Sequence, residues 1–454
     1  MRETLRQLVR KFGRRCDLVE LRREERESAD LSFSDRLESI QTERAAGFAL
    51  RVVHRGVTAF ASVTDPERIE DALARLVAAA ETAPRGGATL APAPALRRAV
   101  RTRPLEDPRA VPLAGKKRLL KGYVSRLKRA SPAIVSAHAS YHETFAKLLF
   151  LNSHGSEATW DHFELFAAVS ATAHRHGVTQ SDHETIGSAV DFGVVRALGR
   201  EVPGVADLAV RLTAAPKAES GIKTVILDPS LAGVFVHEAF GHTAEADGIA
   251  DSPEKRKIMK IGARFGSGKL TIFDSGLEPG SRGALPFDDE GTPCERTVLI
   301  ENGILVSLLH SRLTAGRMGA RPTGSARAVD FRHAPIVRMR CTCIAGGTDT
   351  FADMRRGLAD GLYCLKSMGG TGGEMFTFST GHAYRIRDGE IGELVRDVKL
   401  SGNLFTTLNH IDMVGDDFRV VESAGGCGKE GQFPLPVAYG SPHIRIRDVV
   451  VGGA

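Results

Sequence analysis

The chain has 454 residues, of which 42% are hydrophobic and 26% charged, an ordinary composition that excludes wholesale disorder. Because a single hydrophobic core rarely grows past about 250–300 residues, this length predicts two domains. Lys and Arg (61) barely exceed Asp and Glu (55), so the net charge of +6 is weak evidence for nucleic-acid binding. Six cysteines without a CxxC pair indicate a reducing compartment rather than a disulfide framework.

The first fifteen residues are predicted to form a helix of the fold rather than a targeting signal. Leu5, Leu8, Val9 and Phe12 recur at helical spacing, but basic residues interrupt them, so the segment lacks the apolar run of a secretory signal. No stretch of the sequence approaches the roughly 18 consecutive apolar residues of a membrane span. We therefore expect a cytoplasmic protein without a membrane partner.

The N-terminal half is predicted to be α+β. Residues 16–62 alternate between apolar and polar and are interrupted by turn sequences, which predicts an antiparallel meander. Asp65 followed by Pro66 is typical of a helix start, and apolar residues then recur at helical spacing as far as Ala80. Further on we expect a surface connection at residues 84–112 and a helix at 116–129. A group of strands at 134–185 and a last helix at 205–212 follow.

The C-terminal half is predicted to be β-rich. The composition changes at residues 214–221 from Arg-rich amphipathic segments to glycine-rich strands. We therefore expect an N-terminal α+β domain of residues 1–215 and a C-terminal β-rich domain of residues 216–454. Asn302-Gly303 and Asp388-Gly389 each separate two apolar runs, which predicts two hairpins. One short helix, at residues 351–358, is expected to interrupt the strands.

The most informative segment is residues 224–247, TVILDPSLAGVFVHEAFGHTAEAD. Its first residues predict a strand, Asp228 can cap the helix that follows, and this helix would carry His237, Glu238 and, at its end, His242. Histidine and glutamate on an otherwise apolar helix are costly to bury unless something pairs with them. A metal ion would supply that pairing, and two satisfied histidines at a helix end are the alternative.

The spacing of the two histidines sets a condition on the helix. In the zinc-protease motif HExxH the histidines are four residues apart and share one helical face, whereas here the motif is HExxxH. Five residues of regular α-helix turn about 500°, which leaves the two imidazoles about 140° apart around the axis, too far to bind one ion. We therefore expect a π-type turn or a break at residues 240–242, permitted by Gly241 through a wider turn or a positive φ.

The whole C-terminal half resembles the TldD/PmbA family of metallopeptidases, in particular its catalytic TldD-type members. The resemblance covers essentially residues 220–454 and, more weakly, the N-terminal half. It implies a zinc ion bound by His237, His242 and Cys427, with Glu238 as the catalytic base. The residues that carry it are those at 225–247 and four further segments, LPFDDEGTP (285–293), TVLIENGIL (297–305), GGCGKEGQ (425–432) and VVGG (450–453).

The sequence around Cys427 agrees with a ligand role. Three neighbouring glycines would let the backbone approach an ion, and Lys429 would favour the thiolate that binds zinc. A free buried cysteine is the alternative. Glu245, three residues after His242, is a rival third ligand, although we expect it to orient one of the histidines instead.

Two histidines, one thiolate and an open fourth position are typical of a catalytic metal site. Zinc would acidify a water and polarise the scissile carbonyl, while Glu238 would accept the proton of the water and return it to the leaving amine. The resemblance implies hydrolysis of amide bonds in short or unfolded peptides, as in leader-peptide trimming or peptide degradation, and we expect such a peptide to be held in extended form by strand addition. The resemblance implies a dimer, formed by two copies or with a PmbA/TldE-type subunit.

Some features leave alternatives open. Cys341 and Cys343 share one face of a strand where family members usually have no thiol pair. If that strand lines the cleft, a specialised biosynthetic amide hydrolase acting on a modified peptide or metabolite is an alternative function, whereas two core cysteines are the simpler explanation. A non-catalytic scaffold subunit of a TldD/TldE-type complex is a further alternative. Residues 288–290 are expected to form an acidic turn rather than a second metal site, and residues 369–373 a flexible turn rather than a phosphate-binding loop.

Overall fold

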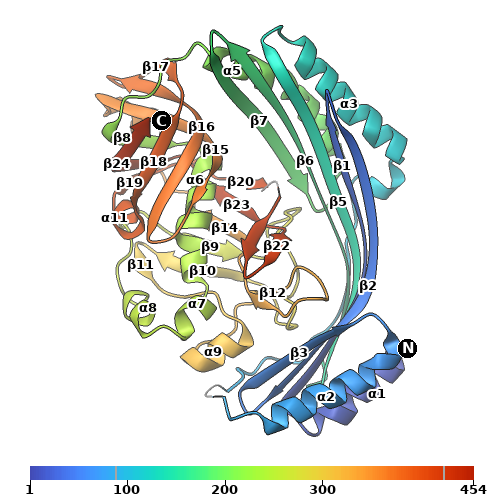
Figure 1. Ribbon diagram of the computed structural model, residues 1–454. Coiled ribbons are helices and arrows are strands. Elements are labelled where there is room, and N and C mark those ends of the chain that lie inside the picture. Colours follow the sequence, from blue (N-terminus) through green and yellow to red (C-terminus); the bar gives the residue numbers. More distant parts are fainter. Residues whose placement is uncertain (87–88, 423–424, 454) are drawn as a thin grey trace.

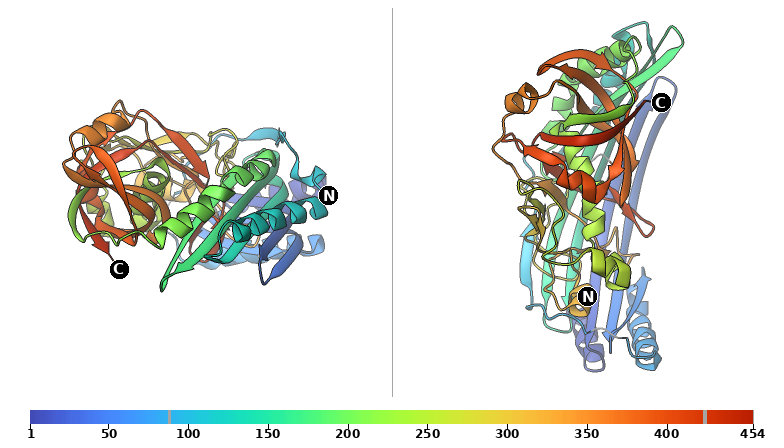
Figure 2. Two further views of the ribbon diagram at one scale, coloured as in Figure 1. Left: turned by 90° about the horizontal axis from the view of Figure 1, so that it is seen from above. Right: turned by 90° about the vertical axis from the view of Figure 1, so that its left-hand side faces the viewer.

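The computed structural model describes residues 1–86, 89–422 and 425–453, which fold as an α+β protein (Figure 1). A long, curved sheet of the N-terminal half runs along the molecule, and the C-terminal half packs on its concave side (Figures 1 and 2). No helix among the described residues is long and apolar enough to cross a membrane.

Seven strands form this N-terminal sheet, in the order β3-β2-β1-β5-β6-β4, with β7 paired to β6. The strands are β1 (Leu18–Ser34), β2 (Glu38–His54), β3 (Val57–Val63), β4 (Arg97–Arg101), β5 (Ile134–Asn152), β6 (Glu157–Arg175) and β7 (Val178–Ser188). The helices of this half are α1 (Arg2–Gly13), α2 (Ile69–Thr82), α3 (Leu113–Arg129), α4 (Gly193–Ala197) and α5 (Val202–Leu212), with short 3₁₀ turns at Pro66–Arg68, Pro108–Ala110 and Leu198–Arg200.

The alternation of side chains along β1 explains how the two halves meet. Successive residues of a strand point to opposite faces. The odd-numbered apolar residues of β1 therefore share one face, and they pack against α1 and α2 near one end of the strand and against α3 and α5 near the other end. The even-numbered residues Glu20, Arg22 and Glu24 are buried on the opposite face, which the C-terminal half covers.

The C-terminal half contains two sheets with a helix between them. In the barrel sheet, five strands pair in a closed ring, β15-β8-β24-β18-β16 and back to β15, while β17 and β19 pair outside it. The central sheet has the order β11-β10-β9-β14-β23-β20. Helix α6 (Pro229–Phe235) lies between them, and Phe235 packs its ring against Phe376 and Phe378 of the barrel sheet (Figure 1).

The remaining bounds are as follows. The barrel sheet contains β8 (Gly221–Leu227), β15 (Asp360–Thr371), β16 (Met375–Arg387), β17 (Glu390–Val395), β18 (Val398–Asn403), β19 (Ile411–Val414) and β24 (Ile444–Gly453). The central sheet contains β9 (Ile272–Ser275), β10 (Arg296–Glu301), β11 (Ile304–Leu305), β14 (Cys341–Ile344), β20 (Arg419–Glu422) and β23 (Ala438–Ser441). Two small ribbons pair β12 (Ala326–Arg327) with β13 (Ile336–Val337) and β21 (Cys427–Lys429) with β22 (Gln432–Leu435), and the short helices are α7 (Asp247–Ala250), α8 (Pro253–Ile258), α9 (Arg312–Met318), α10 (Phe351–Arg356) and α11 (Leu404–Asn409).

The α+β class and both predicted hairpins are confirmed, and Asp65 caps the 3₁₀ turn Pro66–Arg68, which leads into α2, by accepting a hydrogen bond from the Glu67 N–H. The surface connection expected at residues 84–112 is wrong in part, because Arg97–Arg101 form strand β4. This strand is mostly exposed and, within the described residues, pairs only with β6, in parallel, so its composition shows no apolar alternation. The domain division at residue 215 stays a prediction.

The acidic turn expected at residues 288–290 is buried between the two halves of the chain. Glu290 pairs with Arg51 of β2 at 2.6 Å, and Asp289 pairs with Arg22 of β1 at 2.7 Å. Arg51 also pairs with Glu20 at 2.7 Å, and burial raises the pKa of the Glu20 carboxyl. Asp289 and Glu290 are thus paired with arginines of the N-terminal half, so the turn joins the two halves of the chain.

This buried network predicts a large loss of stability when its central arginine is removed. We expect Arg51→Met to lower the free energy of unfolding by about 3–5 kcal/mol, because two buried carboxylates lose their cation. The matched control Lys11→Met removes an exposed pair with Glu70 and should change stability by less than about 1 kcal/mol. Equal unfolding curves for the two variants in urea would contradict this account of the interface.

Candidate metal centre

The helix that carries the motif changes its winding at the motif itself. Asp228 caps α6 by accepting a hydrogen bond from the Leu231 N–H at 2.9 Å, and Pro229 occupies the first turn. From Val236 to Gly241 the helix continues as a π-helix, followed by a 3₁₀ turn at His242–Ala244. The His242 N–H donates to the carbonyl oxygen of His237, five residues earlier, as a π-turn requires. The predicted departure from regular α-helix is confirmed.

Of the two ways in which Gly241 was expected to permit this turn, the structure shows the wider π-turn and not the positive φ. The φ of Gly241 is −56°, a right-handed helical value that any residue adopts, so a positive-φ break is excluded. A Cβ atom at this position would lie 2.0 Å from the sulfur of Met339, which is fully buried. The glycine is therefore needed for close packing of the ligand turn against the core.

The widened turn brings two imidazoles and one thiol together. The ligand atoms of His237, His242 and Cys427 all lie within 4.8 Å of one another, and His242 Nε2 lies 3.2 Å from the Cys427 sulfur. The ring centroids of the two histidines are 5.4 Å apart at 78°. His237 is buried, and its Nδ1 has no hydrogen-bond partner in the described parts of the chain. Two imidazoles and a thiolate are a donor set that suits zinc, so the residues present fit such an ion.

Cys427 reaches the cluster on a separate two-stranded hairpin, β21–β22, in which it pairs with Leu435. Gly426 precedes it with a φ of 117°, and a Cβ there would lie 2.5 Å from the Leu435 carbonyl oxygen, so this tight approach requires glycine. Burial alone would raise the pKa of the Cys427 thiol, but hydrogen bonds from His237 and His242 outweigh it and lower this pKa to about 5. The thiol is therefore held as the thiolate, the form that binds metals.

The charge on His242 follows from the same contacts. Burial lowers the pKa of this imidazole, but hydrogen bonds to Cys427 and Glu245 outweigh it and raise the pKa to about 10. The protein without an ion therefore holds a thiolate beside an imidazolium. Since a metal binds neutral imidazole, binding would release a proton from this pair.

Glu238 is more exposed than either histidine of the motif. Its side chain is 38% exposed, and Oε2 lies 3.9 Å from His242 Nε2. The backbone of the glycine-rich segment packs directly on it, because a Cβ at Gly372 would lie 2.1 Å from the Glu238 carbonyl oxygen. Glu238 is thus the carboxylate that water and substrate can reach beside the cluster.

Glu245 lies behind His242 rather than among the three converging groups. Its Oε2 is 3.1 Å from His242 Nδ1, and the side chain is 2% exposed. Lys429 does not serve the thiolate as expected, since its ammonium binds Glu245 and Asp247 instead. The hydrogen bond between Lys429 and Asp247 could not be predicted from the sequence. The two residues are 182 positions apart, and only the fold brings them into contact.

Two other motifs prove to be structural. Cys341 and Cys343 share a face of β14, with sulfurs 3.5 Å apart, but both are fully buried beside Phe273 and Ala438 and line no cleft. Residues 369–371 end β15 instead of forming the expected turn, which is confined to the residues before β16, and Gly370 and Gly372 pack closely on the backbone of Thr377 and Glu238.

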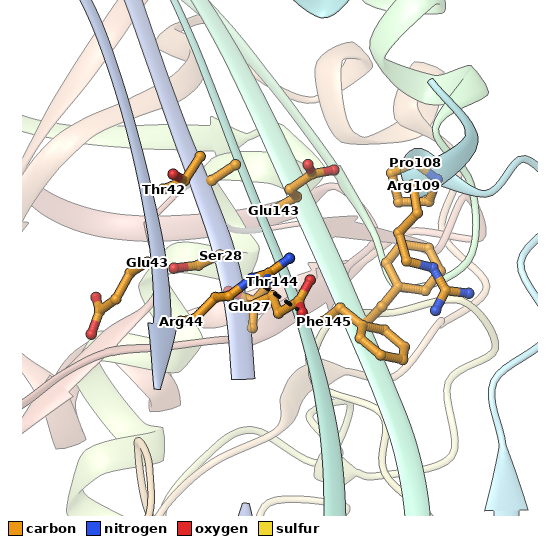
Figure 3. A pocket seen from close by; sticks show the side chains of 12 residues that line it. Glu27, Ser28, Thr42, Glu43, Arg44, Pro108, Arg109, Glu143, Thr144 and Phe145 are labelled. Atoms are coloured by element: carbon orange, nitrogen blue, oxygen red, sulfur yellow. Dashed lines mark ion pairs between the residues drawn. The ribbon is translucent and has the colours of Figure 1, made fainter. Parts of the chain in front are cut away.

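A cavity of about 490 Å³ lies elsewhere, over strands β1, β2 and β5 (Figure 3). It occupies the middle of the sheet face, between the stretches covered by the two pairs of helices. Its lining includes an ion pair between Glu27 and Arg44, and Arg109 stacks on Phe145 at 4.2 Å (Figure 3). None of its lining residues belongs to the His237, His242 and Cys427 cluster.

Comparison with known proteins gives the same class of protein. Three models of the PmbA/TldA metallopeptidase match this chain: domain 1 at residues 19–83, the central domain at 106–215 and the C-terminal domain at 220–453. A metalloprotease of Synechocystis is 41% identical, with 99% of this chain and 98% of that protein covered. A zinc metalloprotease TldD homolog of Saccharolobus solfataricus is 36% identical, with 52% of this chain and 53% of that protein covered.

The solved structure of TldE from Thermococcus kodakarensis has the same fold, with a TM-score of 0.74 at 19% identity, covering 99% of this chain and 100% of that chain. Fold, cluster and relatives together define a metallopeptidase. The chain belongs to the PmbA/TldD family.

The packing of Gly241 predicts that its replacement damages the core as well as the cluster. We expect Gly241→Ala to lower the free energy of unfolding by about 1–3 kcal/mol, because the new methyl group overlaps the Met339 sulfur. Met339→Ala should make room for it, so the double variant should be more stable than the sum of the two single effects predicts. Strict additivity in thermal unfolding would show that this contact does not constrain the turn.

Proposed function

We propose that this metallopeptidase uses zinc to hydrolyse amide bonds of short or unfolded peptides. The observation that carries the proposal is the convergence of His237, His242 and Cys427 beside the exposed carboxylate of Glu238. Two imidazoles and one thiolate leave a fourth position open, as catalytic rather than structural zinc sites do. The name of the Saccharolobus relative, a zinc metalloprotease, supports the choice of metal.

In this proposal His237, His242 and Cys427 hold the ion, and Glu238 moves the proton. Bound zinc supplies Lewis acidity, which acidifies water and polarises a carbonyl group. The Glu238 carboxylate accepts a proton from the attacking water and then donates it to the nitrogen of the leaving amine. Glu245 accepts a hydrogen bond from His242 Nδ1 at 3.1 Å, which leaves Nε2 facing the thiolate.

An extended peptide suits the strand edge beside Glu238. β15 pairs with β8 only as far as Cys364, while its pairing with β16 continues to Thr371. In the described chain, no strand pairs with residues 367–371 on the side away from β16. This free edge leads to Gly372, which contacts the Glu238 backbone. A peptide added at this edge would bind through main-chain hydrogen bonds, with little selection of side chains.

The alternatives are weaker. The burial of Cys341 and Cys343 removes the reason to favour a specialised amide hydrolase. A non-catalytic scaffold has no need of Glu238 beside a preformed donor set. We also propose a dimer, formed either with a second copy of the chain or with a PmbA/TldE-type subunit. Co-purification at native expression level would distinguish the homodimer from the heterodimer.

Glu238→Gln tests the catalytic base. We expect this variant to retain near-stoichiometric zinc while hydrolysis of a peptide mixture falls by at least about a hundredfold, because the ligands remain and the base is lost. Zinc is measured by elemental analysis and hydrolysis by mass spectrometry. An unmodified protein that holds no zinc after reconstitution would overturn the function, and a variant that keeps its activity would overturn the role of Glu238.

Cys427→Ser and Glu245→Gln separate the third ligand from its rival. We expect the serine variant to lose most zinc affinity, because a hydroxyl is a far poorer zinc ligand than a thiolate. The glutamine variant keeps a hydrogen-bonding side chain behind His242, so its loss should be smaller. Competition with a chromogenic chelator measures both affinities, and the reverse order would transfer the ligand role to Glu245.

A further inference from the structure

We infer that Lys429 is a positioning residue that fixes the Cys427 hairpin against the segment carrying His242. The inference rests on the proposed function for its purpose, but the contacts that support it are properties of the protein without an ion. Lys429 lies two residues after Cys427 in β21, and its side chain is 15% exposed.

The hairpin needs such an anchor because it belongs to neither large sheet. β21 and β22 pair only with each other among the described strands. Gln432, the cross-strand partner of Lys429, holds one side of the hairpin, since its amide accepts from the Val329 N–H at 3.0 Å and donates to the Ala334 carbonyl at 3.0 Å. On the side that faces His242, Lys429 makes the corresponding contacts.

The ammonium of Lys429 makes two hydrogen bonds and one further ion pair, so three oxygens surround it. They are Glu245 Oε2 at 3.1 Å, Asp247 Oδ1 at 2.6 Å and the Val337 carbonyl oxygen at 2.9 Å. The other carboxylate oxygen of Asp247 accepts the Val337 N–H at 3.1 Å, so the acceptors also hold one another in place. A single nitrogen therefore joins the hairpin to two separate segments of the C-terminal half.

The same contacts lead directly to a ligand. Glu245 Oε2 lies 3.1 Å from Lys429 Nζ and 3.1 Å from His242 Nδ1. Lys429 and His242 thus share one buried carboxylate oxygen, which connects the position of the hairpin to the orientation of the ring. We conclude that Lys429 sets the distance between Cys427 and His242 before any ion binds.

The test compares Lys429→Met with Lys269→Met. Methionine keeps most of the length of the side chain but removes all three donors, and it leaves Glu245 and Asp247 without their cation. Lys269 forms an exposed pair with Asp349 in the same half, so its variant is a matched control. We expect Lys429→Met to weaken zinc binding by about 10–100-fold in chelator competition, and the control to bind as the unmodified protein does.

A second measurement needs no metal. In the metal-free protein, amide hydrogen exchange of residues 427–435 should be at least about fivefold faster in Lys429→Met, because the hairpin opens locally without its anchor. Asp247→Asn, which keeps the Glu245 contact, should give a smaller change in both measurements and serves if the methionine variant fails to fold.

The outcomes separate the inference from the proposed function. Zinc affinity and hairpin exchange that both stay within twofold of the unmodified protein in both variants would overturn the role of Lys429. If the unmodified protein binds no zinc, the proposed function fails, and the exchange measurement alone then decides whether Lys429 fixes the hairpin.

Discussion

The candidate site depends on one departure from regular helix. Histidines five residues apart point to different sides of an α-helix, and only the wider π-turn, with the His242 N–H bonded to the His237 carbonyl, lets both rings meet one sulfur. The close contact of Gly241 with Met339 allows this turn to lie against the core. Cys427 completes a set of three metal-ligand atoms, with the partly exposed Glu238 beside it, only because the two rings converge.

The surrounding fold holds this turn from both sides. The helix is capped at Asp228 and packed through Phe235 against the barrel sheet, so its start is fixed before the winding changes. The N-terminal sheet contributes through a longer chain of contacts, since Arg26 donates to the Val329 carbonyl and the Val329 N–H donates to Gln432 of the ligand hairpin. The charged face of β1 therefore supports the loop against which the hairpin is anchored.

Much of this arrangement could be predicted from the sequence, because it is encoded locally. The HExxxH spacing predicts the distorted helix, and Asx-Gly pairs predict the hairpins. What could not be predicted depends on contacts between distant segments. The burial of Asp289 and Glu290 requires Arg22 and Arg51 of the other half, and the need for Gly241 is visible only when Met339 lies against it. Strand β4 could not be predicted, because its conformation depends on backbone pairing with β6 rather than on a pattern of its own side chains.

We propose above all that His237, His242 and Cys427 hold one zinc ion. X-ray absorption at the zinc edge of the reconstituted protein tests it most directly, because sulfur and nitrogen ligands differ in distance. We expect one sulfur at about 2.3 Å and nitrogen ligands at about 2.0–2.1 Å, with the sulfur contribution absent in Cys427→Ser. A shell of nitrogen and oxygen alone in the unmodified protein, or a sulfur contribution that persists without Cys427, would contradict the proposal.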